Sequence, residues 1–172
     1  MADVSVRPAR PEDAERVARV QLSTWRSAYA DLLPEEALAL PLEQVASVWL
    51  NAIEAPPSPQ HRLLVAVEHG ELVGFAASQP AEDLPEAVEV TALLVEPRWG
   101  RRGHGSRLLA ASVDHWRADG FPLALMWVFE TDAVVTAFLE SAGWAREPLR
   151  RGLDLGPRVA HQYRMQADIT EA

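Results

Sequence analysis

One stretch indicates the fold most directly: Val95-Glu96-Pro97-Arg98-Trp99-Gly100-Arg101-Arg102-Gly103-His104-Gly105-Ser106-Arg107-Leu108-Leu109. In it, an apolar strand pattern passes through a basic, glycine-containing turn directly into a helical pattern. Amide N–H groups at a helix N-terminus lack intrahelical partners, and the helix dipole adds partial positive charge there. Glycines let a phosphate approach that backbone closely. We therefore predict a diphosphate-binding turn over residues 101–106, called the anion loop below; the alternative is a strand-to-helix turn with solvated arginines.

The anion loop matches neither of the two common nucleotide-binding motifs. A P-loop requires a lysine, and this sequence contains none. A dinucleotide-binding fingerprint requires a third glycine three residues after Gly105, where the chain has Leu108. The loop must therefore be interpreted together with the rest of the chain.

The bulk composition predicts one acidic globular domain. The chain has 172 residues, 48% hydrophobic residues and a net charge of −9, which favours a single domain over residues 1–172. The acidity argues against a nucleic-acid partner and is compatible with a cationic substrate. There is no cysteine and no apolar run long enough to cross a membrane, so we expect a cytoplasmic protein without disulfides and without a membrane partner. The histidines lack the spacing of metal ligands, so no metal is expected.

The hydrophobic periodicity predicts an α/β (α+β) fold. Apolar residues recur at helical spacing after Pro11 and again after the anion loop, and Asp132 is placed to cap a helix that ends at Gly143. The predicted strands cover residues 3–8, 62–67, 72–78, 87–95, 121–129, 144–151 and 158–165. The run Phe121–Phe129 is almost continuously apolar, which is typical of a strand covered on both faces.

Three stretches in this order resemble the GNAT superfamily of acetyl-CoA-dependent N-acetyltransferases. The first is Leu93–Pro97 followed by the anion loop, which resembles the family's fourth strand and pyrophosphate loop. The second is Asp132–Trp144, which resembles the family's Asn-x-x-Ala-x-x-Phe-Tyr-x-x-x-Gly-Phe motif. The third is Ser23–Pro34, with Trp25, Tyr29 and Leu33-Pro34 in a pattern common in bacterial members.

The resemblance implies a fold and a co-substrate. It implies a mixed, mostly antiparallel sheet of about seven strands, with the fourth and fifth strands splayed apart and helices on both faces. Acetyl-CoA would be the co-substrate, its pantetheine arm pairing with the fourth strand and its diphosphate held by the loop. The residues implied to bind it are Leu93, Leu94, Val95, Arg101, Arg102, Gly103, His104, Gly105, Ser106, Asp132 and Phe138.

The resemblance also implies acetyl transfer to a primary amine of a small molecule or peptide by direct attack. Glu89 is the first candidate for the general base, because a carboxylate near the acceptor can take its proton. Strand alternation predicts that Glu89 shares one sheet face with Thr91, Leu93 and Val95. The plain alternative is an exposed carboxylate at a strand edge. Glu130 is the second candidate, with a charge in the first turn of a helix as its alternative.

Trp25 and Tyr29 are expected to line the acceptor pocket; the alternative, especially for Trp25, is ordinary core packing. His104 either touches phosphate or packs at the helix start. The six tryptophans suggest an aromatic surface and hence a homodimer.

The chain departs from the family pattern at three positions. Gly100 replaces a glutamine or arginine, and Asp132 replaces an asparagine, keeping a cap but losing a donor. Leu139 replaces the tyrosine that often protonates the departing thiolate, which leaves water, the proton of the amine, or Tyr29 as the source. The last departure motivates a second hypothesis, a weakly catalytic acyl-CoA-binding sensor or regulatory domain.

Overall fold

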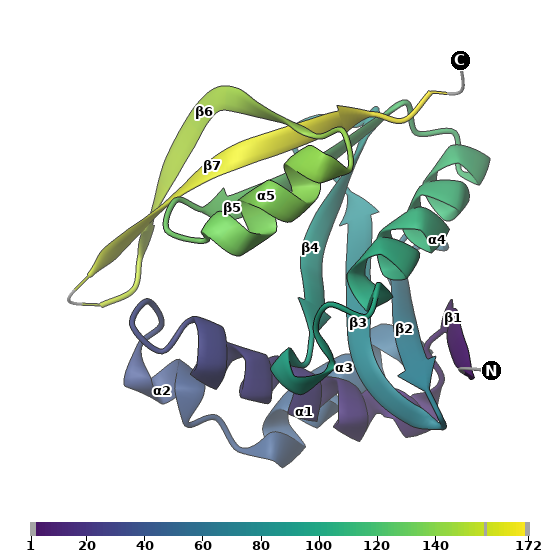
Figure 1. The fold of residues 1–172 in the computed structure, drawn as a ribbon, viewed down its shortest axis with the longest axis vertical. Helices are drawn as coiled ribbons and strands as arrows, with labels where there is room; N and C mark the ends of the chain where they lie inside the picture. The colour runs from purple at the N-terminus through teal and green to yellow at the C-terminus, as the bar shows by residue number, and fades with distance from the viewer. Residues whose placement is uncertain (1–2, 157, 171–172) are drawn as a thin grey trace.

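The computed structural model describes residues 3–156 and 158–170. Figure 1 shows a single twisted sheet with helices on both sides. The helices are α1 (Ala14–Ala28), α2 (Glu35–Leu38), α3 (Leu42–Glu54), α4 (His104–Ala118) and α5 (Ala133–Ser141), with 3-10 turns η1 (Pro11–Asp13) and η2 (Pro97–Trp99). The strands are β1 (Val4–Pro8), β2 (Arg62–Glu68), β3 (Glu71–Pro80), β4 (Ala87–Val95), β5 (Leu123–Phe129), β6 (Ala145–Asp154) and β7 (Val159–Asp168).

The seven strands form one sheet in the order β1-β2-β3-β4-β5-β7-β6. Only β4 and β5 are parallel, and every other neighbouring pair is antiparallel. The predicted α/β fold, with a mixed and mostly antiparallel sheet of seven strands, is therefore confirmed. Strands from residue 4 to residue 168 share this sheet, and a single domain over residues 1–172 stays a prediction for the chain as a whole.

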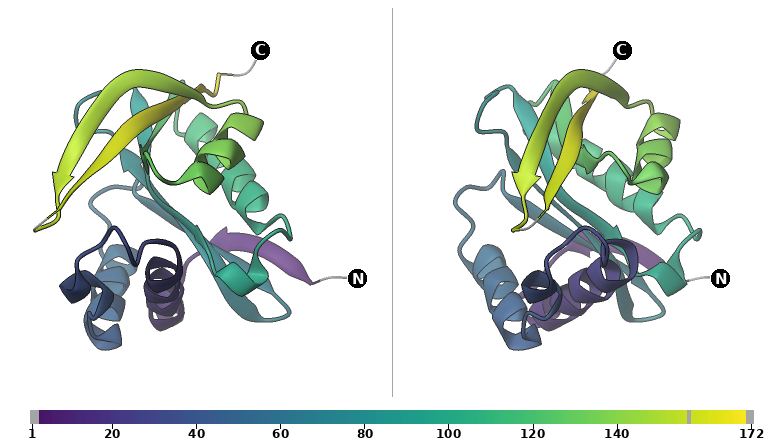
Figure 2. Two further views of the ribbon diagram at one scale, coloured as in Figure 1. Left: turned by 60° about the vertical axis from the view of Figure 1, so that its left-hand side comes forward. Right: turned by 90° about the vertical axis from the view of Figure 1, so that its left-hand side faces the viewer.

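The helices divide between the two faces of the sheet (Figure 2). One face of β2 and β3 packs against the apolar stripe of α1, where Val17 and Val20 contact Val65 and Phe75. We call this side the α1 face. The opposite side, the α4 face, packs against α4 and α5 through Trp116 and Leu139 among others. None of the described helices is both long and apolar enough to cross a membrane.

β4 and β5 separate part of the way along their length. Ala87–Val90 pairs with Leu123–Met126, and beyond these residues the two strands have no paired positions. The predicted splay is therefore confirmed. It leaves the backbone of β4 after Val90 bonded to β3 on one side only, so the edge of the strand that faces β5 is free to accept an added partner.

One extra residue in β4 overturns a prediction about its faces. Ala77 pairs with Ala92 and Ser78 pairs with Val90, so Thr91 bulges out of the ladder. Strand alternation restarts after it: Val90 and Leu93 both pack on the α4 face, whereas Ala92 packs on the α1 face. Glu89 alternates with Val90 and therefore belongs to the α1 face. The prediction that Glu89 shares a face with Leu93 and Val95 is wrong, because simple alternation ignores the bulge.

Two further expectations are corrected. The predicted aromatic surface is absent from the described residues, where no tryptophan side chain is fully exposed: Trp116 and Trp144 are buried in the core, and the other four are half-buried. The homodimer stays a prediction, without support from an exposed aromatic surface. β5 is also not covered on both faces, because Trp127 and Phe129 on the α1 face stay half-buried and line a pocket.

Candidate active site

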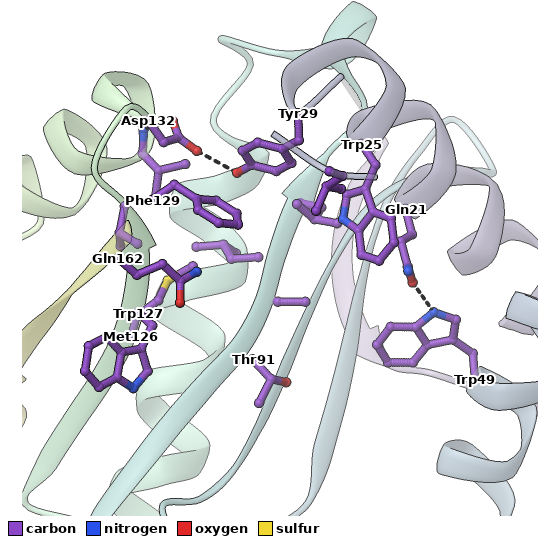
Figure 3. A pocket seen from close by; sticks show the side chains of 16 residues that line it. Gln21, Trp25, Tyr29, Trp49, Thr91, Met126, Trp127, Phe129, Asp132 and Gln162 are labelled. Atoms are coloured by element: carbon purple, nitrogen blue, oxygen red, sulfur yellow. Dashed lines mark hydrogen bonds between the residues drawn. The ribbon is translucent and has the colours of Figure 1, made fainter. Parts of the chain in front are cut away.

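The splay between β4 and β5 opens into a cavity of about 350 Å³ (Figure 3). This volume is in the range of small-ligand sites. Residues 91–94 of β4 form one wall and residues 126–129 of β5 form the other, and α1 closes the end. The remaining lining residues are Gln21, Trp25, Tyr29, Leu33, Trp49, Asp132, Val135 and Gln162. The predicted pocket residues Trp25, Tyr29, Leu93, Leu94 and Asp132 are thus brought together.

The anion loop presents its backbone amides without internal acceptors. Among the described residues, the next amide bond after Gly100 is donated by Arg107 to the Gly103 carbonyl, at 3.0 Å. Arg101 and Gly103 both have left-handed backbones, with φ of 62° and 81°. Alternation of left-handed and right-handed residues turns successive N–H groups into one concavity, a geometry that binds anions. The backbone of residues 101–106 therefore has unpaired amides and two left-handed residues at the N-terminus of α4, as the predicted anion loop requires.

Unlike the backbone amides of the anion loop, the side chains of Arg102 and His104 have partners within the protein. Arg102 points away, donating to the buried Glu68 at 2.9 Å and stacking 5.0 Å from the centre of the Trp99 ring. His104 is almost fully buried, and its Nε2 lies 3.5 Å from a Glu68 oxygen. Burial and the nearby Arg107 guanidinium lower the pKa of His104. The side chains of Arg102 and His104 are therefore engaged within the protein, with Glu68 and Trp99 as partners.

Gly105, at the start of α4, lies next to Phe138 of α5. A Cβ placed there would lie 3.5 Å from the Phe138 ring, in ordinary contact. Phe138 also packs against the core on the α4 face. Both residues were predicted to bind the cofactor, and the structure places them side by side, with Phe138 beneath the start of α4.

Asp132 joins two distant parts of the pocket. One carboxylate oxygen accepts from the Val135 amide at 3.1 Å, which confirms the predicted helix cap. The other accepts from the Tyr29 hydroxyl at 2.5 Å, across 103 positions of sequence. Burial and this bond raise the pKa of Tyr29 well above its ordinary value. The Tyr29 ring also packs on Phe129, with ring centres 5.4 Å apart.

Glu89 is half-buried in the paired part of β4, two residues before the lining residue Thr91, and is not itself among the residues that line the cavity. Burial is the main cause that raises its pKa, and the Arg151 guanidinium opposes this while Asp83 and Glu82 add to it. A raised pKa brings a carboxylate closer to the range useful for proton transfer near neutral pH. Glu89 therefore has the electrostatic environment expected of a base.

Neither Glu130 nor Leu139 contributes a proton-transfer group to the cavity. Glu130 is ion-paired with Arg150, and this bond lowers the pKa of its carboxyl. It is not among the lining residues. Leu139 is completely buried in the core on the α4 face. Glu130 thus matches its plain alternative, a charge near a helix start.

Sequence reasoning missed several residues of the site. Gln21 and Trp49 line the cavity and are joined by a 2.6 Å hydrogen bond from the indole N–H (Figure 3). Gln162 and Trp127 line it from β7 and β5. These four residues come from separate elements and form no local motif. Period-two alternation of β5 and β7 could have indicated a common face for Trp127 and Gln162 only.

This arrangement of splayed parallel strands and an anion loop defines an acyl-transferase fold. A family model described as the Acetyltransferase (GNAT) family matches residues 22–144, more than half of the chain. The chain therefore belongs to the GNAT family of acetyltransferases, as its sequence motifs predicted.

Individual relatives agree with this assignment. YuaI of Bacillus subtilis (strain 168), an uncharacterised N-acetyltransferase, is 28% identical over 130 residues, which are 74% of this chain and 72% of YuaI. The PaiA N-acetyltransferase of Thermoplasma acidophilum, solved in complex with coenzyme A, has a TM-score of 0.78 at 20% identity, covering 96% of this chain and 99% of that one. YncA of Salmonella typhimurium, solved with its cofactor acetyl-CoA, has a TM-score of 0.76 at 17% identity, covering 99% and 96%. At these identities the two solved structures establish a shared fold.

Proposed function

We propose that this protein transfers the acetyl group of acetyl-CoA to a primary amine of a small molecule or peptide by direct attack. The observation that carries the proposal is the combination of two sets of backbone groups that have no partner among the described residues. They are the free edge of β4 at Leu93–Val95 and, after the short turn η2, the amides of the anion loop. The structural neighbours PaiA and YncA, which hold coenzyme A and acetyl-CoA, support this assignment.

Acetyl-CoA fits these features by chemistry. A pantetheine arm carries two amide groups, which can pair with a strand edge, and its diphosphate suits the amides and helix dipole at residues 101–106. Arg101, exposed at the loop, adds a cation. The thioester would then lie in the cavity near Thr91 and Met126, on the side approached by Glu89.

The reaction needs one proton acceptor. An alkyl amine must be neutral to attack, and Glu89 takes the proton that the nitrogen loses, directly or through water. The nitrogen–carbon bond forms, the carbon–sulfur bond breaks, and the sulfur leaves as the coenzyme A thiolate. Because the Tyr29 hydroxyl donates to Asp132, its proton is not directed at the cavity. We therefore favour water or the proton released by the amine as the acid for the thiolate.

The decisive experiment measures coenzyme A release from acetyl-CoA against a panel of primary amines, alongside calorimetry of coenzyme A binding. We expect binding together with turnover of at least one amine class. Binding without turnover of any amine would favour the sensor alternative, for which Leu139 is the motivating residue. Absence of binding would contradict the anion-loop assignment itself.

A further inference from the structure

The α1 face of the C-terminal strands carries one arginine whose charge is not neutralised. Arg151 of β6 reaches across β7 and lies 4.3 Å from the centre of the Trp127 ring. Its Nε donates to the Gln162 side-chain oxygen at 2.8 Å. Among residues 3–156 and 158–170, no carboxylate oxygen lies within ion-pair distance of this guanidinium, and the carboxylates that act on it from farther away are Glu89 and Asp83.

Two neighbouring arginines differ from Arg151 because they form ion pairs. Arg164, on the same face, is ion-paired with both Glu147 and Asp83. Arg150, next along the chain, is ion-paired with Glu130. Arg146 of β6 also stacks on a ring without an ion pair, but it does so on Tyr163, on the α4 face. On the α1 face, Arg151 is held in place without an ion pair, whereas Arg164 is paired. Stacking fixes the plane of the Arg151 guanidinium and the Nε bond fixes its rotation, so the two terminal nitrogens present a fork suited to a carboxylate.

The register of the strands places this fork beside the cavity and near Glu89. Glu89 pairs with Leu125 on β5, and Trp127 is two residues further along that strand on the same face. Both residues that hold Arg151, namely Trp127 and Gln162, line the cavity (Figure 3). Glu89 lies on β4 and Arg151 on β6, with β5 and β7 between them. Neither side chain is among the residues that line the cavity, but Arg151 contacts two residues that do, and the two opposite charges interact electrostatically.

We propose that the acceptor is a small zwitterionic amine, an amino acid, whose carboxylate is bound by Arg151 while its amine faces Glu89. This inference rests on the proposed function and narrows its acceptor class. An ammonium group alone would be repelled by Arg151, and an anion alone by Glu89. A molecule carrying both groups satisfies both, with its side chain directed toward the aromatic residues Trp25 and Trp49.

The test compares the twenty amino acids with their decarboxylated amines, such as phenylalanine with 2-phenylethylamine and leucine with 3-methylbutylamine. Binding to the coenzyme A-loaded protein is measured by calorimetry, and turnover by thiol release. We expect at least one amino acid to bind and react about tenfold better than its amine, because the bidentate contact is absent from the amine. Arg151→Gln should remove this preference through KM, with kcat nearly unchanged, and Arg151→Lys should restore part of it.

The matched control is Arg19→Gln, which removes an exposed arginine on α1 far from the cavity. It should keep the wild-type preference. Equal or better binding of the amines in wild-type protein would overturn the amino-acid proposal, and this comparison needs no variant to fold. A preference unchanged in Arg151→Gln would overturn the role of Arg151. Discrimination in binding without turnover would instead contradict only the proposed acetyl transfer.

Discussion

The anion loop and the acceptor pocket are built in opposite ways. The loop consists of six consecutive residues, two of them with left-handed backbones, whose amides have no acceptor among the described residues. The pocket is assembled from α1, β4, β5 and β7, and one of its contacts joins residues 103 positions apart. Local geometry therefore determines the first site, and strand register determines the second. The following predictions test this contrast, from the largest expected effect to the smallest.

The largest effect is expected at Glu89, on the acceptor side. Glu89→Gln should lower kcat by about 10²-fold or more while leaving coenzyme A affinity unchanged, because it removes the base and not the cofactor site. The wild-type rate should rise with pH through the raised pKa of Glu89. A pH–rate profile checks both expectations, with Glu71→Gln on β3 as a strand-glutamate control. Turnover unaffected by the change would remove Glu89 as the base.

The raised pKa of Glu89 also makes the free energy of unfolding depend on pH. Because its folded-state pKa is raised, its stabilising effect is present at acidic pH and lost as pH rises through that pKa. Glu89→Gln should therefore stabilise the protein at pH 7, by up to about 1 kcal/mol. This gain should shrink below the ordinary carboxyl pKa. Urea unfolding at both pH values measures it, and equal stability at pH 7 would argue that burial does not penalise the charge.

Substitutions at Gly103 and Gly120 distinguish loss of coenzyme A binding from the cost of backbone strain, because both glycines have positive φ and only Gly103 lies in the anion loop. Gly103→Ala places a Cβ 3.0 Å from an Arg107 nitrogen at φ +81°, whereas Gly120→Ala has φ +90° with open space around it. Both changes should cost about 1–2 kcal/mol of stability through left-handed strain. Only Gly103→Ala should weaken coenzyme A binding, by roughly tenfold, since it disturbs the amide concavity. Similar losses of affinity in both variants would contradict the loop assignment.

Neighbouring arginines in the loop should have different roles. Arg101→Gln should weaken coenzyme A binding a few-fold, and the loss should diminish at high salt because its side chain is exposed. Arg102→Gln should leave the affinity nearly unchanged and lower the free energy of unfolding by about 1–3 kcal/mol, since buried Glu68 loses its partner. Calorimetry and thermal unfolding of both variants test this division. A large loss of coenzyme A affinity in Arg102→Gln would show that the Arg102 side chain binds the diphosphate.

The smallest effect is expected at Tyr29. Tyr29→Phe removes its bond to Asp132 and keeps its ring against Phe129, so it should cost about 0.5–1.5 kcal/mol of stability and change kcat less than threefold. Steady-state measurement of kcat and KM for Tyr29→Phe tests this expectation. A large fall in kcat with unchanged KM would make Tyr29 the acid that protonates the thiolate.

The sequence predicted features that depend on neighbouring residues. The anion loop and the Asp132 cap follow from glycine, proline and capping chemistry within a few positions. Glu89 was identified as a candidate, but its face was assigned wrongly, because the bulge at Thr91 is visible only in the pairing of β4 with β3. Arg151 was missed, since its significance arises from an unneutralised position over Trp127, on another strand.

The extra residue at Thr91 shifts the alternation of side chains between the two faces of β4 by one position. Deleting it would exchange the sides of every residue from Ala92 to the turn, without altering any of their identities. The number of residues in β4 therefore determines, as much as their identities do, which side chains face the cavity.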